Sequence, residues 1–185
     1  MKQKRIAAAV VMVCMVLLAL PLGVNRSLTK LREEAASSYY YDKTGFDIKS
    51  GIDARENAAG NMVTVAQRYT AGNEVLDAKV NDLDRAVKVS KNVAYGEHEE
   101  EAQANRVLGD AFQALYEELE KVQLSEKDEK FSAQLRQEMK SQQYMIVHSS
   151  YNDDARAFNE RLERFPVNFL KYAAFVKPLG VFEEN

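Results

Sequence analysis

The sequence predicts an all-α protein, with one N-terminal transmembrane helix followed by an elongated antiparallel bundle of three to four helices. Its 185 residues include only 8 Gly and 3 Pro, whereas a β-sandwich or barrel needs a turn about every 8–12 residues. Apolar residues recur at helical spacing along most of the chain, and no segment shows sustained alternation of apolar and polar residues. An uncharged run near the N-terminus is long enough to cross a bilayer.

The beginning of the chain predicts a basic leader over residues 1–5 and a transmembrane signal anchor over residues 6–24. The leader carries three basic residues, and the 19 residues that follow carry no charge, close to the roughly 20 that cross a hydrocarbon core. A cleaved signal peptide is an alternative, although the end of the run lacks an A-x-A-like site. Lipidation at Cys14 is another, although bulky residues precede it. The anchor interpretation predicts a single-pass protein of the cell membrane that contacts the lipid bilayer through residues 6–24.

The orientation of the anchor follows from the charges beside it. Positively charged flanks stay in the cytoplasm, and the leader therefore favours export of the rest of the chain. Arg26, Lys30 and Arg32 follow the run and nearly balance the leader. We expect the body to lie outside the cytoplasm.

Residues 25–46 form a predicted juxtamembrane segment between the anchor and the body. A helix can continue to about Ser38, followed by Tyr39-Tyr40-Tyr41 and a break over residues 42–46. Tyrosines collect at membrane interfaces because their rings are amphipathic. The three tyrosines could lie there or pack at the base of the bundle, and the sequence does not decide between these positions.

Residues 47–185 form the predicted helical bundle. Apolar residues recur there at steps of three and four, in places as a coiled-coil a/d seam. Turns are expected at residues 71–73 and 91–97, where Gly72 and Gly96 suit helix ends, and Ser125 is a candidate N-cap with Asp128 as its partner. The stripe residues are Ile48, Ile52, Ala59, Met62, Val63, Ala66 and Tyr69; Leu76, Val80, Leu83 and Val87; Ala104, Leu108, Ala111, Leu115, Leu119 and Val122; and Phe131, Leu135, Met139 and Ile146.

The last long helix shows the most specific pattern. After a slip near residues 148–151, an aromatic and aliphatic seam resumes, and Asn152 and Asn159 sit beside it seven residues apart. A buried amide without partners costs about 1–3 kcal/mol, so these residues either fix the helix register or contact a ligand or partner. Pro166 starts a short new helix, because proline suits the first helical turn, and Phe182 docks the tail. The seam consists of Tyr151, Ala155, Phe158, Leu162, Phe165 and Phe169.

This pattern resembles the C-terminal signature of LemA family proteins. The signature residues are Tyr151, Asn152, Ala155, Phe158, Asn159, Leu162, Phe165 and Pro166, followed by Phe175, Lys177, Pro178, Phe182 and Glu183. Asn61-Met62-Val63 is similar to the family's Asn-Leu-Val motif. Arg55-Glu56 and Gly60 stand where other members carry paired basic residues and a proline, which indicates a divergent branch. The resemblance implies a bacterial, membrane-anchored helical bundle with no established enzymatic activity.

The sequence offers no convincing catalytic or metal-binding set. A di-iron bundle needs Glu-x-x-His motifs, and the residues three before His98 and His148 are Tyr95 and Met145. The acidic run around His98 is typical of a solvated first helical turn, and residues 148–153 cannot form a triad from adjacent positions on one helix. A single Cys excludes a multi-cysteine metal cluster. We therefore expect no catalytic, cofactor-binding or metal-binding residues and no cofactor.

The favoured function is that of a membrane-anchored, non-enzymatic structural or interaction protein of the LemA type in a bacterial envelope assembly. Its expected partners are other membrane or envelope proteins, or further copies of itself. Nucleic acid is not expected, because 25 basic and 28 acidic residues give a net charge of −3. The alternative is a ligand-sensing helical ectodomain with a pocket between helices near Asn152 and Asn159.

Overall fold

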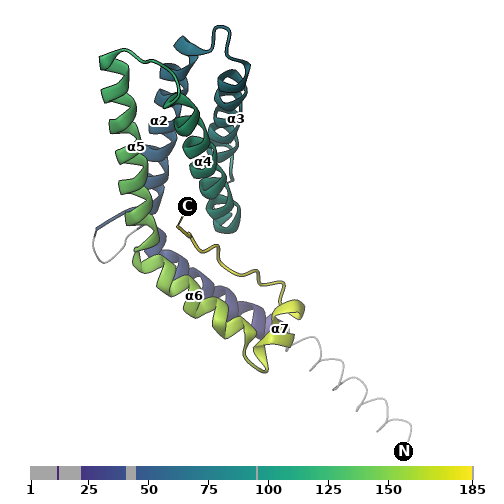
Figure 1. Cartoon of the computed structure of the whole chain (residues 1–185). Helices are drawn as coiled ribbons and strands as arrows, with labels where there is room; N and C mark the ends of the chain where they lie inside the picture. The colour runs from purple at the N-terminus through teal and green to yellow at the C-terminus, as the bar shows by residue number, and fades with distance from the viewer. Residues whose placement is uncertain (1–11, 13–21, 41–44, 95, 185) are drawn as a thin grey trace, which may run out of the picture. The chain divides into compact units, whose positions relative to one another are not determined.

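The computed structural model describes residues 12, 22–40, 45–94 and 96–184, and all the regular structure in them is helical (Figure 1). This confirms the all-α prediction. The predicted leader and nearly all of the predicted span over residues 6–24 lie outside the described residues. Among the helices that are described, none combines the length and apolar character needed to cross a bilayer.

The chain forms two compact units, each made of two separate stretches of sequence. The bundle unit comprises residues 38–153 and 180–185, and the second unit comprises residues 1–37 and 154–179.

Four helices make up most of the bundle unit: α2 (Ile48–Ala66), α3 (Glu74–Lys91), α4 (His98–Leu119) and α5 (Glu126–Val147). Helix α2 packs against α5 and α3, and α3 packs against α4. Consecutive helices run in opposite directions (Figure 1). A short 3-10 helix, η2 (Gln67–Tyr69), extends the end of α2, and another, η1 (Ser37–Tyr39), precedes it.

Polar side chains set the starts of three of these helices. The carboxylate of Asp47 accepts from the Lys49 N–H at 2.9 Å, and the amide oxygen of Asn73 accepts from the Leu76 N–H at 3.0 Å. The Ser125 hydroxyl accepts from the Asp128 N–H at 3.2 Å, which confirms the predicted cap. The predicted turns at residues 71–73 and 91–97 are also confirmed, since helices end and begin there.

Most predicted stripe residues are buried in the bundle unit, together with Ala58, Val65, Ala86 and Phe112, which the stripes did not include. Phe131 is partly exposed, because the buried face of α5 runs through Asp128, Ser132, Leu135 and Met139 at steps of four and three. Position 131 lies about 100° away from position 132 around the helix. The stripe assignment of Phe131 was therefore wrong. The core residues are Ala58, Ala59, Met62, Val63, Val65, Ala66, Leu76, Val80, Leu83, Ala86, Val87, Leu108, Phe112, Leu115, Leu119, Leu135 and Met139.

The predicted slip near residues 148–151 is a break between two helices. Helix α5 ends at Val147, and α6 (Ser150–Glu163) begins three residues later. The Ser149 hydroxyl donates to the Ile146 carbonyl at 2.7 Å and satisfies one carbonyl at the end of α5. His148 is exposed and stacks on Tyr144, with ring centroids 4.1 Å apart.

The second unit contains a helix over residues 22–36, most of α6, α7 (Val167–Ala173) and an extended segment that follows α7. Pro166 is the N-cap of α7, so the predicted restart is confirmed. The predicted seam was wrong for Phe165 and Phe169, which are exposed. Helix α6 ends at Glu163, and residues beyond it no longer follow the register of the seam. The buried apolar residues of this unit are Leu28, Ala155, Phe158, Leu162, Ala174 and Leu179.

Candidate functional site

Asn152 holds the C-terminal tail of the bundle unit through its side-chain amide. Its Nδ2 donates to the Phe182 carbonyl at 2.8 Å, and its Oδ1 accepts from the Phe182 N–H at 2.9 Å. The same Nδ2 donates to the Val147 carbonyl at 2.8 Å, at the end of α5. We call this arrangement the Asn152 clamp. The side chain is fully buried, so each of these bonds satisfies a group that water cannot reach.

The side chain of Phe182, the residue bound by Asn152, packs in an aromatic cluster. We call this group, which consists of Tyr39, His98, Tyr151 and Phe182, the aromatic cluster. The centroid of the Tyr39 ring lies 4.5 Å from that of His98 and 5.5 Å from that of Tyr151. The Tyr151 and Phe182 centroids are 6.0 Å apart in an edge-to-face arrangement, which is favourable for aromatic pairs. Tyr39 therefore packs at the base of the bundle unit, whereas Tyr41 lies outside the described residues.

Gly180 brings the tail against the start of α4. The Tyr151 hydroxyl donates to the Gly180 carbonyl at 2.9 Å. A Cβ atom on residue 180 would lie 2.2 Å from the His98 carbonyl oxygen and 2.5 Å from the Glu99 Cα. These are backbone atoms, so only glycine fits this approach.

His98 corrects the prediction of a solvated acidic first turn. Glu99 and Glu100 are exposed as expected, but His98 is buried in the aromatic cluster. Its Nδ1 lies 3.2 Å from a carboxylate oxygen of Glu101. Burial, together with the Glu101 charge, raises the pKa of the Tyr39 hydroxyl far above its ordinary value. The sequence could not show this, because the cluster joins residues from four separate segments.

Asn159 makes the equivalent contact in the second unit, which we call the Asn159 clamp. Its Nδ2 donates to the Leu179 carbonyl at 2.8 Å, and its Oδ1 accepts from the Leu179 N–H at 2.8 Å. The side chain is only half-buried. The two asparagines are seven residues apart in the sequence, and their partners are three residues apart.

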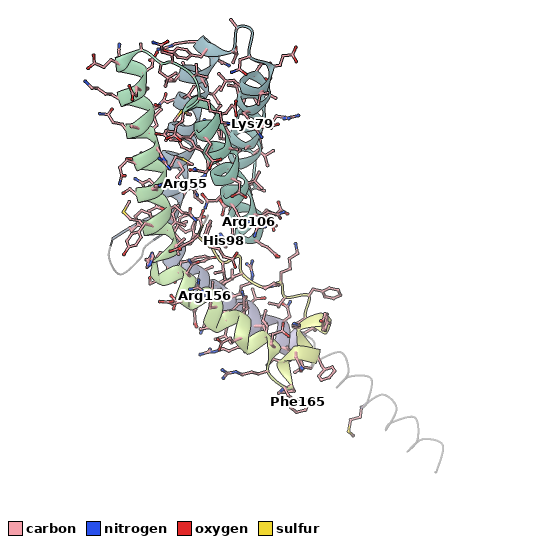
Figure 2. The ribbon with its side chains drawn as sticks, in the orientation of Figure 1. Arg55, Lys79, His98, Arg106, Arg156 and Phe165 are labelled. Carbon is pink, nitrogen blue, oxygen red and sulfur yellow. The ribbon has the colours of Figure 1, made fainter. Side chains whose placement is uncertain are left out.

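A buried polar network in the bundle unit is centred on Arg55, which Figure 2 labels. The Arg55 guanidinium donates to the side-chain oxygens of Asn105 and Gln143, and Gln143 donates to the Glu183 carbonyl. Asn105 also donates to Gln143 at 2.9 Å. Burial lowers the pKa of Arg55 to about 10, because an apolar environment disfavours the charged form.

The sequence carried a signal for this network that the stripe analysis missed. Residues 48, 52, 55, 59 and 62 advance by four and three, so Arg55 falls in the seam of α2. Gln143 likewise falls between Met139 and Ile146 on α5. Glu56 is also buried and accepts from the Ser90 hydroxyl at 2.6 Å. Polar residues at seam positions predict buried partners.

A cavity of about 480 Å³ opens beside this network. Residues of α4 and α5 form its walls, and Arg55 lies among its lining residues. Arg136 and Lys140 add positive charge, whereas Asp110 and Glu184 add negative charge. The lining therefore carries charges of both signs, and the Arg55 guanidinium already donates to Asn105 and Gln143.

No group of three or more His, Cys, Asp or Glu side chains in the described part of the chain is placed to hold a metal ion. Nδ1 of His148 lies 2.9 Å from the Tyr144 carbonyl oxygen, and Ser149 donates to the Ile146 carbonyl, so these two side chains serve the helix end.

In comparisons with known proteins, no family model, no curated protein and no solved structure matches this chain. The roles of the signature residues therefore rest on their geometry. Tyr151 and Asn152 bind tail residues in the bundle unit, and Asn159 does so in the second unit. Phe158 and Leu162 are buried in the second unit.

Proposed function

We propose that this chain is a non-enzymatic, membrane-anchored interaction protein of the LemA type in a bacterial envelope assembly. In this proposal residues 6–24 cross the membrane once and carry an antiparallel helical bundle outside the cytoplasm. Its partners are other membrane or envelope proteins, or further copies of the chain.

The observation that carries this proposal is that the signature residues bind the C-terminal tail or are buried in the core. Asn152 and Asn159 use both ends of their amides to bind the tail, and Phe158 and Leu162 are core residues. A ligand would have to displace the tail to reach either amide. The signature residues thus stabilise a helical scaffold. This favours an interaction protein over an enzyme.

The uncharged run over residues 6–24 supports the anchor. It follows three basic residues, and it has the length of a membrane-crossing helix. The last three residues of the run, 22–24, belong to the described helix over residues 22–36.

Membrane fractionation and thiol labelling of the full chain test the proposal. Cys14→Ser removes the only native thiol, and Lys127→Cys introduces one at an exposed position that leaves the Ser125 cap intact. We expect the protein to stay in carbonate-washed membranes and to react with an impermeant thiol reagent in intact cells. Recovery in the soluble fraction would contradict the anchor, and labelling only after lysis would contradict the orientation.

The cavity beside Arg55 favours a second candidate function, the sensing of a small anionic ligand. It lies between helices as the ligand-sensing hypothesis requires, although away from the predicted contacts Asn152 and Asn159. A thermal-shift screen of small carboxylates and phosphates tests it, because a ligand at 100 times its Kd stabilises the folded state by about 2.7 kcal/mol. Lys140→Ala should abolish a genuine shift, whereas Lys127→Ala, on the same helix outside the cavity, should not. An absence of shifts with every compound would remove this candidate.

A further inference from the structure

Four large aromatic side chains are exposed together around α7. Phe165, Phe169, Tyr172 and Phe175 are 83%, 68%, 72% and 91% exposed. The Phe165 and Phe169 rings pack edge to face on each other, with centroids 6.4 Å apart, and Figure 2 marks Phe165 at the turn between α6 and α7. We call these four residues the aromatic patch. Clustered exposed aromatic residues are typical of a surface that contacts another apolar phase or molecule.

The backbone at Phe175 closes the end of α7. Its φ is +53°, in the left-handed region that the residue after a helix C-cap commonly adopts. The Val176 N–H donates to the Lys171 carbonyl at 3.2 Å, and the Phe175 N–H donates to the Tyr172 carbonyl at 3.3 Å. These bonds fix the chain direction at the residue whose ring is the most exposed of the four.

Two hydrogen bonds fix the position of the patch within the second unit. The Asn25 Nδ2 donates to the Ala174 carbonyl at 2.6 Å, and the Arg32 Nε donates to the Lys177 carbonyl at 3.2 Å. Asn25 directly follows the last residue of the uncharged run, and Ala174 directly precedes Phe175. The aromatic patch therefore lies beside the first turn after residue 24.

We propose that the aromatic patch inserts into the headgroup region of the lipid bilayer beside the membrane span. This inference rests on the proposed anchor over residues 6–24, and it assigns a membrane contact to a second segment, about 140 residues further along the chain. Tyrosine is enriched at this depth because its ring is amphipathic, and phenylalanine is typical of the apolar face of segments that lie in the interface.

Basic side chains near the aromatic patch are compatible with a contact to lipid headgroups. Lys171 lies 5.3 Å from the centroid of the Tyr172 ring and forms an ion pair with Glu163 at 2.5 Å. Arg26 is exposed in the same unit, and Arg164 is exposed and forms an ion pair with Glu160 at 3.4 Å. Basic residues that flank aromatic ones are typical of surfaces that meet anionic lipid headgroups.

The absence of tryptophan from the chain makes a direct test possible. Phe169→Trp and Phe175→Trp each place a single fluorophore in the patch, and Glu33→Trp places one on the same helix as Asn25, exposed and about 12 Å further along its axis. The full-length variants are reconstituted into phosphatidylglycerol-containing vesicles, with and without lipids brominated near the start of the acyl chain.

Quenching by the brominated lipids decides the proposal. A ring that lies about 5–10 Å into the headgroup and acyl boundary should lose about half of its emission, whereas the Glu33→Trp control should lose almost none. Variants that stay in the vesicles with no more quenching than the control would overturn the inference and leave the anchor intact. Blue-shifted emission without quenching would also overturn it, because a protein, such as a second copy, would then cover the patch. A chain that does not remain with the vesicles would overturn the proposed anchor and this inference with it.

Discussion

Asn152 and Asn159 each hold one tail residue by its backbone N–H and C=O, but their surroundings differ. Asn152 is fully buried, and its clamped residue Phe182 lies in the aromatic cluster. Asn159 is half-buried, and its partner is the aliphatic Leu179. The same hydrogen-bond geometry should therefore contribute differently to stability, because water can replace the partner of an exposed amide but not of a buried one.

The largest effect is expected when the side chain held by the Asn152 clamp is removed. Phe182→Ala should lower the free energy of unfolding by about 3–5 kcal/mol, because it leaves a cavity in the aromatic cluster. Phe175→Ala is the matched control on the same tail, and it should cost less than about 0.5 kcal/mol in urea unfolding, since its ring is exposed. Similar losses in the two variants would mean that the tail is not part of the core.

Removing the two amides separately tests the comparison directly. Asn152→Ala leaves buried backbone groups of Phe182 without partners and should cost about 2–4 kcal/mol, whereas Asn159→Ala should cost about 1 kcal/mol. Amide hydrogen exchange should lose protection at Phe182 in the first variant and at Leu179 in the second. Asn152→Asp keeps the acceptor and loses the donor, so it should fall between wild type and Asn152→Ala. Equal costs for the two alanine variants would show that burial does not distinguish the clamps.

A smaller decrease in the free energy of unfolding is expected when the tail is displaced without a change to either asparagine. Gly180→Ala forces a Cβ against the backbone at the start of α4, which should cost about 1–3 kcal/mol and should expose the Phe182 amide to exchange. Gly60→Ala is the control: it lies in α2 with no atom within 4 Å of the added Cβ, and it should stabilise by about 0.5–1 kcal/mol. A neutral Gly180→Ala variant would contradict the close approach of the tail.

Acid should weaken a contact of the bundle unit that does not involve either clamp. The Tyr69 hydroxyl, with Ser125 and the Arg68 charge, holds the pKa of Asp128 below its ordinary value. The folded pKa is thus lower than the unfolded value of about 3.9, so the stabilisation is complete above that pH and is lost as the pH falls through the folded pKa. In urea unfolding, the difference in the free energy of unfolding between wild type and Asp128→Asn should become smaller as the pH falls. Protection of the Phe182 amide should be the same in both proteins; a loss in the variant would mean that the clamp depends on this contact.

Local patterns predicted the helices and most of their ends. Apolar spacing identified α2 to α5, and Gly72, Gly96 and Ser125 marked turns and a cap, because these features depend on neighbouring residues alone. The spacing of Asn152 and Asn159 predicted buried, partnered amides, but not the tail as their partner. That contact depends on segments about 20 to 30 residues apart that meet only in the folded chain.

Burial of single polar or aromatic residues was less predictable. Phe165 continues the seven-residue spacing of the seam in the sequence, but α6 ends two residues before it. His98 lies in a charged run, yet its ring is buried against Tyr39 and Tyr151 from two other segments. The burial of these two side chains depends on where a helix ends and on which other segments pack against it. Apolar periodicity gives no information on either.

The place of Phe182 in the aromatic cluster has a consequence for biosynthesis. Translation proceeds from the N-terminus, so Tyr39, His98 and Tyr151 all leave the ribosome before the residue that packs among them. Until then the base of the bundle unit has an open apolar socket, and partly folded chains with exposed apolar surface are prone to aggregation. We expect this interval to be the time at which a nascent chain most needs a chaperone, with the arrival of the tail ending that dependence.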